Sequence, residues 1–455
     1  MEETQNKLAT QPVGKLLFSL ALPAIAAQII NALYNIVDRM YIGRIEGTGS
    51  LALAALGVAF PLILIISAFA SLIGMGGAPR AAIKMGEGNH EEAEKILGNS
   101  FITLIGISVV LTIFFFFAKA PLLTAFGATE NTLPLADSYF SIYLIGTIAV
   151  QISLGLNMFI SAQGFAKTSM YTVLIGAIVN IVLDPILIFG FNMGVRGAAL
   201  ATIISQFISA IWVITFLYSK KTGLKIYKKH FKLERRIILP VLALGISPFI
   251  MQSTESLVQV VFNSGLKQYG GAQTDQLVGA MSIILSTMQF VMMPLVGLTQ
   301  GAQPIISYNY GAGNLDRVKK TFSLLLVSSL TFSVVVWSVC MIAPQIFVSL
   351  FSSDAALLEI GVYGMRIFMG GVLLMGAQLA CQQTFIALGQ AKISMFLALL
   401  RKIILLVPLA LILPRIFGWK GILYAEPIAD ILAMLTTVTV FFFFSRRLFS
   451  DTKET

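Results

Sequence analysis

The chain has 455 residues, of which 57% are hydrophobic and only 11% are charged, with a net charge of +10 and a mean hydropathy of +0.87. Soluble domains carry about 25% charged residues, so this composition excludes an ordinary soluble protein and predicts an all-α polytopic membrane protein. The distribution of the basic residues argues against nucleic acid as a partner, because they gather in connections that lack interleaved aromatic side chains.

Twelve apolar runs are long enough to cross a bilayer, for which about 20 residues suffice. We therefore expect twelve transmembrane helices, several of them long enough to be tilted or bent. Prolines inside four of the runs are expected kink points, namely Pro23, Pro61, Pro248 and Pro294. The runs lie near residues 15–37, 52–79, 96–118, 133–160, 169–190, 196–218, 237–265, 277–305, 321–346, 357–387, 393–414 and 420–444.

The lysines and arginines predict the orientation of these helices. The amino terminus, the even-numbered connections and the carboxyl tail hold 21 of the 31 basic residues, and the odd-numbered connections hold eight. Because cytoplasmic loops of membrane proteins are enriched in basic residues, both termini are expected in the cytoplasm. The densest basic stretch, from Lys220 to Arg236, is expected to lie near anionic lipid head groups.

The second half of the chain repeats the first at a constant offset, the one that places Pro23 on Pro248. Each half has six spans, an even number, so the two halves share one orientation and form a parallel repeat. We expect an amino-terminal lobe of residues 1–218, a basic linker of residues 219–236 and a carboxy-terminal lobe of residues 237–455. Further coinciding residues are Gly76 with Gly301, Pro79 with Pro304 and Gly164 with Gly389, followed, after a slip of one residue, by Gly194 with Gly418.

One apolar run in the first half, Val179–Phe189, carries polar residues inside a span. Asn180 and Asp184 are four residues apart and therefore share a helix face. Pro185 has no N–H group, so the carbonyl of Ile181 loses its helical partner. A carboxylate in hydrocarbon costs about 2.5–3.5 kcal/mol on insertion scales, which makes this face a candidate site for a cation or a proton.

The carboxylates inside the spans of the first half are absent from the matching positions of the second. If they only stabilised the fold, the twin half would need them as well, so their loss indicates a task performed by one lobe. The counterparts of Asp38, Asn180 and Asp184 are Asn263, Leu405 and Leu409.

These residues predict a cation-coupling site formed by Asp38, Asn180 and Asp184, with the hydroxyl of Thr202 as a further oxygen donor. Pro23 precedes Asp38 on the first span and is the expected hinge. Sodium would take the oxygens of Asp38, Asn180 and Asp184 as ligands, whereas a proton needs only a carboxylate and a stabilising neighbour. The sequence leaves both ions open.

A purely structural alternative also exists for these carboxylates. Asp38 would pair with the adjacent Arg39 at the membrane edge, and Asp184 would form a structural bond between helices.

Glu255, on the seventh span, belongs to the second half alone, since its counterpart is Ile30. It would either attract cationic substrates, act as a second coupling group, or pair with Arg401, Lys402 or Arg366. Glu426 and Asp430, four residues apart on the last span, are expected to neutralise Arg401 and Lys402 as a structural pair.

Known catalytic patterns are missing from the sequence. It has no GxxxxGK[ST] phosphate loop, no GxSxG and no HExxH, so we expect a protein that is not an enzyme and that does not use ATP directly. Two cysteines and two histidines predict neither a disulfide framework nor a histidine metal cluster.

Together these features resemble the multidrug and toxic compound extrusion (MATE) family, in particular its bacterial, MepA-like branch. The resemblance covers nearly the whole chain. It rests on the two six-helix repeats, on Pro23 and Asp38, and on Asn180-x-x-x-Asp184-Pro185 followed by Gly194-Val195-Arg196-Gly197-Ala198-Ala199.

The resemblance implies a V-shaped pair of six-helix bundles in a bacterial inner (plasma) membrane, acting as a monomer by alternating access. The expected activity is export of amphiphilic, mostly cationic drugs or toxins in exchange for inward protons or sodium, without a cofactor. It assigns cation coupling to Asp38 and Asp184, with Asn180 and Thr202 in support. Candidate substrate-binding residues are Met251, Gln252, Glu255, Met288 and Gln378.

The sequence departs from the family pattern on the tenth span. Some members pair the acid of the seventh span with an aspartate there, whereas this chain has Gln378 and Gln382 in that region. This departure favours Glu255 as an acid that faces the substrate rather than as half of a second cation site.

Three alternatives remain. A flippase for lipid-linked oligosaccharide would be expected to line its cavity with basic residues, whereas the candidates here are acidic. A membrane scaffold or receptor has no evident need for buried carboxylates in only one of two twin halves. An ion channel would need a filter motif that the sequence lacks.

Overall fold

The computed structural model describes residues 7–350 and 355–450. Within these residues every regular element is helical. Eleven helices are long and apolar enough to cross a membrane, and a pair of shorter helices joined by a bend brings the number to twelve if it counts as one span. The prediction of an all-α polytopic membrane protein is therefore confirmed.

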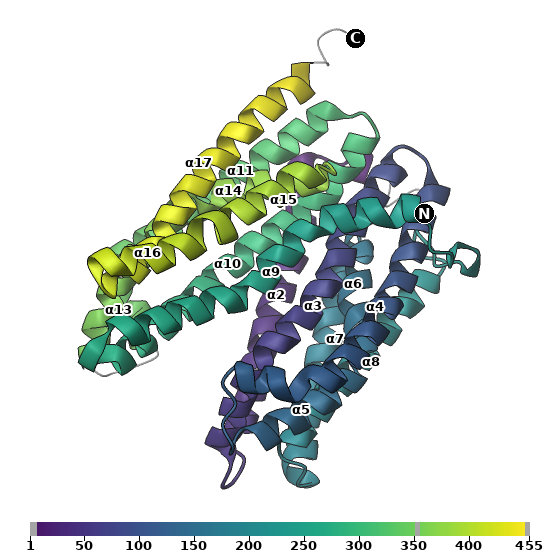
Figure 1. The fold of residues 1–455 in the computed structure, drawn as a ribbon. Coiled ribbons are helices and arrows are strands. Elements are labelled where there is room, and N and C mark those ends of the chain that lie inside the picture. The colour runs from purple at the N-terminus through teal and green to yellow at the C-terminus, as the bar shows by residue number, and fades with distance from the viewer. Residues whose placement is uncertain (1–6, 351–354, 451–455) are drawn as a thin grey trace.

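The helices form two bundles that meet at one end and diverge at the other (Figure 1). We call these the closed end and the open end; α2 begins and α17 ends at the closed end. The first bundle comprises α2 (Val13–Gly43), α3 (Gly49–Gly86), α4 (His90–Ala125), α5 (Leu133–Ile145), α6 (Thr147–Ala162), α7 (Ala166–Pro185), η1 (Ile186–Gly190) and α8 (Val195–Tyr218). After the short turn η2 (Lys228–His230), the second comprises α9 (Arg235–Tyr269), η3 (Gly271–Gln273), α10 (Thr274–Gly311), α11 (Leu315–Ile342), α12 (Pro344–Ser349), α13 (Ala355–Phe368), η4 (Met369–Gly371), α14 (Val372–Ala387), α15 (Ala391–Leu399), η5 (Leu400–Leu406), α16 (Val407–Phe417) and α17 (Lys420–Ser450).

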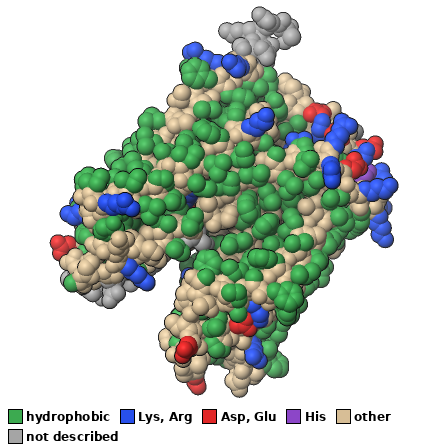
Figure 2. Space-filling model, in the orientation of Figure 1, with side chains coloured by type: hydrophobic (Ala, Val, Ile, Leu, Met, Phe, Trp, Pro, Cys, Tyr) green, Lys and Arg blue, Asp and Glu red, His purple; other side chains and the backbone are tan. Residues whose placement is uncertain are grey.

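The outer surface of both bundles is apolar. Hydrophobic side chains cover most of the face shown in Figure 2, whereas charged side chains gather toward the ends of the molecule. Large side chains such as Phe117 and Ile342 are each 79% exposed. Such exposure would be costly in water but suits a surface that faces lipid. The same view shows the cleft between the two bundles at the open end.

The repeat is visible in the backbone. Glycines with positive φ recur at the same offset as the sequence motifs, because both halves turn in the same way between their helices. Gly194 and Gly418, each in the connection before the last helix of its bundle, have φ of 54° and 60°, which supports the slip of one residue. The other pairs are Gly88 with Gly313, at 76° and 75°, and Gly164 with Gly389, at 86° and 71°.

The fourth predicted span is not one continuous helix. It is bent by 59° between α5 and α6, at Gly146. A Cβ atom at Gly146 would lie 2.7 Å from a side-chain carbon of Ile203, so the bend depends on the missing side chain. The matching tenth span is interrupted at η4, which contains Gly371, the repeat counterpart of Gly146. Both halves thus break the same helix at the same place.

Glycines let the two bundles approach closely at the closed end. Here α3 packs along α9, and α2 packs along α10. A side chain at Gly76 would overlap the carbonyl oxygen of Val241, and one at Gly245 would overlap the carbonyl oxygen of Leu72. Small residues commonly allow such backbone contact between helices in membranes. The closed end is therefore held by contacts that tolerate no added methyl group.

Gly245→Ala is expected to keep the closed end from closing, because the new methyl group would overlap the Leu72 carbonyl. Spin labels at the exposed, repeat-related positions Glu91 and Asp316 would report the separation of the two bundles at this end. We expect a longer distance in the variant than in the wild type. Gly106→Ala is the matched control, since a Cβ there meets nothing within 4 Å. Identical distances in both variants would contradict the role of Gly245.

Candidate functional site

The first bundle brings the two predicted carboxylates together. Asp38 on α2 is 7% exposed and Asp184 at the end of α7 is 0% exposed. Their carboxyl groups are near neighbours although they lie on the first and fifth predicted spans. The pairing follows from the packing of α2 along α7. It places both acids in the interior of one bundle.

Three buried oxygens at this site have no hydrogen-bond donor among the described residues: Asp38 Oδ1, Asp184 Oδ2 and Asn180 Oδ1. Asn180, itself 1% exposed, donates from Nδ2 to Asp184 Oδ1 at 3.4 Å. Buried polar atoms are nearly always paired, so such a group calls for an explanation such as a bound ion or proton. The prediction that Asn180 and Asp184 share a helix face is confirmed by their hydrogen bond.

The end of α7 has an unusual backbone. The α-helix stops at Pro185 and continues as the wider π-helical turn η1 (Ile186–Gly190). Proline cannot donate the usual helical bond, and single π turns of this kind are frequent at functional sites. Asp184 therefore lies at the last regular turn, beside a locally loosened backbone.

The pairing of Asp38 with Arg39 is not observed. The guanidinium of Arg39 instead lies 5.1 Å from the centroid of the Phe60 ring, and Asp38 Oδ1 has no hydrogen-bond donor in the described structure. The side chains near Asp38 include the tyrosines Tyr34 and Tyr139, and Arg39 acts on it only from a distance, without an ion pair in the described structure. The structural alternative for Asp38 is thus contradicted, because no basic group among the described residues forms an ion pair with this acid.

Thr202, on α8, is half-buried and donates its hydroxyl to the carbonyl of Ala198 at 3.0 Å. This bond leaves its oxygen lone pairs available, and the hydroxyl lies within reach of Tyr139, one of the neighbours of Asp38. Thr202 is therefore placed at the edge of the site rather than against the carboxylates. Its role as a supporting ligand stays a prediction.

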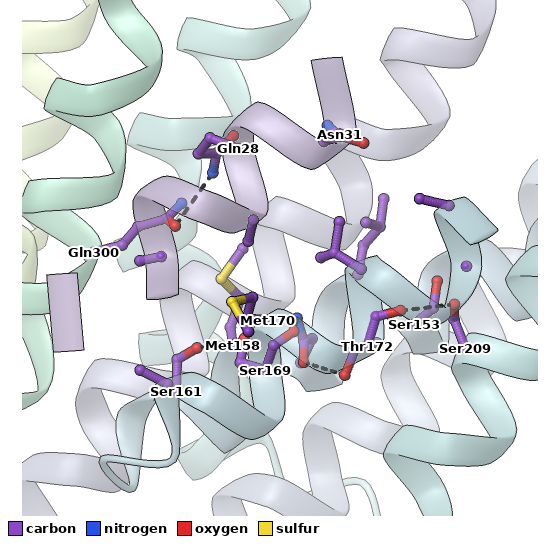
Figure 3. Close-up of a pocket in the computed structure, with 18 of the residues that line it drawn as sticks. Gln28, Asn31, Ser153, Met158, Ser161, Ser169, Met170, Thr172, Ser209 and Gln300 are labelled. Carbon is purple, nitrogen blue, oxygen red and sulfur yellow. Dashed lines mark hydrogen bonds between the residues drawn. The ribbon is translucent and has the colours of Figure 1, made fainter. Parts of the chain in front are cut away.

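A polar cavity of about 150 Å³ is lined by residues that precede Asp38 on α2, up to its neighbour Tyr34. Figure 3 shows a close-up of this cavity. Tyr34 and Gly176, on the two helices that carry the acids, belong to its lining. The cavity is formed mainly by α2, α6, α7 and α8, and α10 of the other bundle contributes Gln300. Its polar lining consists of Gln28, Asn31, Tyr34, Ser153, Asn157, Ser161, Ser169, Thr172, Ser205, Gln206, Ser209 and Gln300.

The polar groups of this cavity bind mainly to one another. Ser153 donates to Gln206 at 2.6 Å, and Thr172 donates to Asn157 at 2.9 Å. Gln28 donates to Gln300 across the two bundles at 3.3 Å. None of the described lining residues is charged. The cavity therefore offers neutral hydrogen-bonding groups and two flexible thioethers, Met158 and Met170.

The predicted substrate-binding residues lie in the second bundle, away from this cavity. Gln252 accepts a hydrogen bond from Ser71 of the first bundle at 2.7 Å, and Met251 accepts one from Gln382 at 3.2 Å. Gln378 is 3% exposed, with its Oε1 unpaired in the described structure, and Met288 packs against the core of the second bundle. Their part in substrate binding stays a prediction.

Most of the cavity lining is not among the site residues predicted from the sequence. A usable signal was present, since Gln28, Asn31 and Tyr34 recur at helical spacing toward Asp38. Ser153 and Asn157 repeat the pattern on the fourth span. Polar residues spaced along one face of a membrane helix indicate a lined interior.

The second bundle buries a cluster of charges. Arg401 on η5 lies 2.7 Å from Asp430 and 3.3 Å from Glu426, both on α17, as predicted. Lys402 does not join them: its amine lies 2.9 Å from Glu255 on α9. The expectation that Glu426 and Asp430 neutralise both basic residues is therefore correct for Arg401 and wrong for Lys402. The pairing of Glu255 with a basic residue is confirmed.

Pro23 lies inside the continuous helix α2, where it is buried. The helix runs unbroken from Val13 to Gly43. Its role as a hinge stays a prediction.

The sequence model of the MatE family matches residues 23–186 and, a second time, residues 248–412. The chain belongs to the MATE family. The two matches begin at Pro23 and Pro248, so they are separated by the same offset as the repeated motifs. Since members of this family are transporters, the prediction of a transporter rather than an enzyme is confirmed.

MATE relatives match this chain over nearly its full length. The multidrug export protein MepA of Staphylococcus aureus (strain NCTC 8325 / PS 47) is 26% identical over 443 residues, covering 97% of this chain and 96% of the relative. MepA of Staphylococcus haemolyticus (strain JCSC1435) is 25% identical over 439 residues, covering 96% of this chain and 95% of the relative. The resemblance to MepA is thus confirmed.

Solved MATE structures share the whole architecture. The MATE multidrug transporter DinF-BH is 35% identical, with a TM-score of 0.88 and coverage of 95% of this chain and 96% of that one. An outward-facing multidrug resistance MATE transporter of the MOP superfamily is 23% identical, with a TM-score of 0.89 and coverage of 99% and 98%. The V-shaped pair of six-helix bundles is therefore the fold of this multi-pass membrane protein.

Proposed function

We propose that this protein is a secondary antiporter that exports amphiphilic, mostly cationic drugs in exchange for inward protons, by alternating access. The observation that carries the proposal is the burial of Asp38 and Asp184 close to each other, where α2 packs along α7. MepA, a multidrug export protein, and DinF-BH, a multidrug transporter, support the class of cargo by similarity. The bacterial plasma membrane is the expected location.

The proximity of the two carboxyl groups favours a proton as the coupling ion. Two ionised carboxylates repel each other, and in a buried site they approach only when they share a proton. The same oxygens, together with that of Asn180, would also suit sodium. A sodium ion would need several further oxygen ligands, whereas a shared proton needs only the proximity of the two acids. Proton coupling is therefore our proposal for this site.

The exchange of a proton for a cationic drug follows from the charge of this site. With a shared proton, Asp38 and Asp184 carry one negative charge, and without it they carry two, with an unpaired oxygen on each acid. A cationic drug in the adjoining cavity would compensate the extra charge across the wall formed by Tyr34 and Gly176. A proton and a cationic drug thus compete for the same negative charge. Binding of one favours release of the other, which is the requirement for antiport.

Alternating access is supported by the two different ends of the molecule. The closed end rests on backbone contacts at glycines, and the open end leaves the cleft accessible (Figure 2). We place the closed end and both termini in the cytoplasm, because the connections at that end are rich in lysine and arginine. The cleft then faces outside, which is the state that releases drug and accepts a proton. The transporter is expected to act as a monomer.

The lipid-linked oligosaccharide flippase remains the runner-up. A pyrophosphate cargo would need basic side chains, and the described cavity lining contains neither lysine nor arginine. Neutral hydrogen-bonding groups beside two acids suit a cationic amphiphile better.

Transport by the purified protein in liposomes tests the proposal. We expect ethidium to accumulate when a pH gradient is imposed, and a protonophore to abolish the accumulation. A sodium gradient alone should have no effect. Accumulation driven only by sodium would reassign the coupling ion, and a lack of accumulation under either gradient would contradict antiport.

A further inference from the structure

The segment that precedes α2 is bound to the second bundle. Residues 7–10 are helical, and Pro12 separates them from α2. Because proline has no N–H group, the carbonyl of Leu8, four residues earlier, has no helical donor. The second bundle supplies the donors instead. Asn309 Nδ2, on α10, donates to this oxygen at 3.1 Å, and Arg317 Nη2, on α11, donates to it at 3.0 Å.

Arg317 joins three acceptors at this point. Its Nη2 also donates to the carbonyl of Gln11 at 2.8 Å, and its Nε donates to Asn309 Oδ1 at 3.1 Å. Asn309 is buried, so the guanidinium is held between an amide of α10 and the backbone that leads into α2. The planar fork of arginine suits such a bridge, because its donors lie in fixed directions. These bonds connect the two bundles at the closed end.

The side chain of Leu8 packs beside these bonds, between the two bundles. It is 1% exposed and belongs to one apolar cluster with Ala166 of the first bundle and Ile305 of the second. A Cβ atom at Gly164, in the connection between α6 and α7, would lie 3.4 Å from Cδ2 of Leu8. The repeat counterpart of Leu8 is Leu233, which is 59% exposed. The burial of Leu8 is thus specific to the amino-terminal segment.

The repeat shows that the bonds of Arg317 also belong to one half only. At the repeat offset, Asn309 and Arg317 correspond to Lys84 and Glu92. Lys84 and Glu92 form an ion pair at 3.4 Å, and both belong to the first bundle. The same two positions therefore tie one bundle to itself in the first half, whereas they tie the two bundles together in the second. A purely structural connection between neighbouring helices would not need this difference.

We propose that Arg317 and residues 7–12 form a latch that holds the closed end shut and opens when the transporter changes to its other state. The glycine contacts allow the bundles to approach, and the latch adds directional bonds across them. The acceptors of Arg317 are two carbonyl oxygens and an amide oxygen, so opening leaves no carboxylate unpaired. The inference rests on the proposed alternating access. It assigns Arg317 a positioning role at the opposite end of α2 from Asp38.

Distance measurements on the full-length protein, without drug or gradient, test the latch. Spin labels at Glu91 on α4 and Lys320 on α11, two exposed positions, would report the separation of the bundles at the closed end. We expect the wild type to show mainly a short distance. Arg317→Met should raise the ratio of long to short distances about tenfold, the effect of losing one hydrogen bond to a charged group. Thermal unfolding checks that the variant is folded.

Glu92→Gln is the matched control, because it changes the repeat counterpart of Arg317 and breaks an ion pair that lies within one bundle. Its distances should equal those of the wild type. Arg317→Lys keeps the charge but lacks the planar fork, so it should open the closed end less than Arg317→Met. If Arg317→Met does not fold, Arg317→Lys and Leu8→Ala carry the test. Wild-type distances in the folded variants of Arg317, or equal opening in Glu92→Gln, would overturn the latch.

Leu8→Ala shows whether the segment and Arg317 act as one unit. It should also open the closed end, because it removes the side chain that packs between the bundles. The double variant Leu8→Ala/Arg317→Met should be no more open than the more open single variant, and full additivity would contradict a single latch. Drug transport does not enter this measurement. Opening in Arg317→Met, combined with no accumulation by the wild type in liposomes, would therefore contradict only the proposed antiport.

Discussion

Asp184→Asn should reduce proton-driven drug accumulation in liposomes to the level of protein-free vesicles. Asparagine keeps the size of the side chain and can still accept the hydrogen bond from Asn180. It cannot ionise, so it cannot alternate between sharing a proton with Asp38 and releasing it. Asp38→Asn should have the same effect. The double variant should be no worse than either single one, because both residues act in one step.

A matched control for these variants lies in the same bundle. Asp137, on α5, is partly exposed and pairs with Lys119 at 2.8 Å. Asp137→Asn should keep the wild-type accumulation, because this acid faces the surface and has its own basic partner. The coupling variants should remain folded, as measured by thermal unfolding, since neutralising an unpaired buried carboxylate removes a desolvation cost. Normal accumulation by both Asp38→Asn and Asp184→Asn would rule out this site as the coupling site.

The proposed coupling site was predictable because the second half of the chain serves as a comparison for the first. Asp38 and Asp184 stand out in the sequence only when they are set against Asn263 and Leu409 in the second half. Helical spacing placed Asn180 beside Asp184, and the structure shows their hydrogen bond. Local periodicity and an internal repeat thus suffice to select these residues. Their proximity to Asp38 depends on the packing of α2 along α7, which spacing alone does not encode.

The polar cavity could not be located in the same way. Its lining comes from several helices, and each contributes ordinary serines, asparagines and glutamines. Whether Gln28 faces a cavity or another helix depends on the rotation of α2, which tertiary packing decides. The bend at Gly146 was likewise hidden, because a glycine within an apolar run is also compatible with a straight helix. A hydropathy profile does not distinguish the bent pair α5 and α6 from one continuous span.

The partner of Glu255 illustrates a third limit. The sequence offered Arg366, Arg401 and Lys402 as candidates, and the structure selects Lys402. The deciding feature is the π-helical turn η5, on which the neighbouring residues Arg401 and Lys402 reach acids of two different helices, α17 and α9. In a regular helix, adjacent side chains point about 100° apart. A local change of helical pitch is not evident from composition.

Arg401→Met is expected to be the most destabilising of these substitutions. It would leave Glu426 and Asp430 buried without their common basic partner. Removing one member of a buried ion pair typically costs about 3–5 kcal/mol, because the remaining charge is not compensated. Thermal unfolding in detergent should show a clearly lower midpoint than for the wild type. Arg415→Met, which removes an exposed arginine from α16, should change the stability by only about 0.5 kcal/mol.

A triple variant can show whether Arg401→Met destabilises the protein through uncompensated charge or through lost packing. The triple variant Arg401→Met/Glu426→Met/Asp430→Leu replaces the buried charges by apolar side chains, and such replacements are often neutral or stabilising. Its unfolding midpoint should return toward that of the wild type, because no unpaired carboxylate remains. A midpoint as low as that of Arg401→Met would instead indicate that the guanidinium is needed for its packing between η5 and α17. In that case the cost would come from a cavity left in the bundle rather than from uncompensated charge.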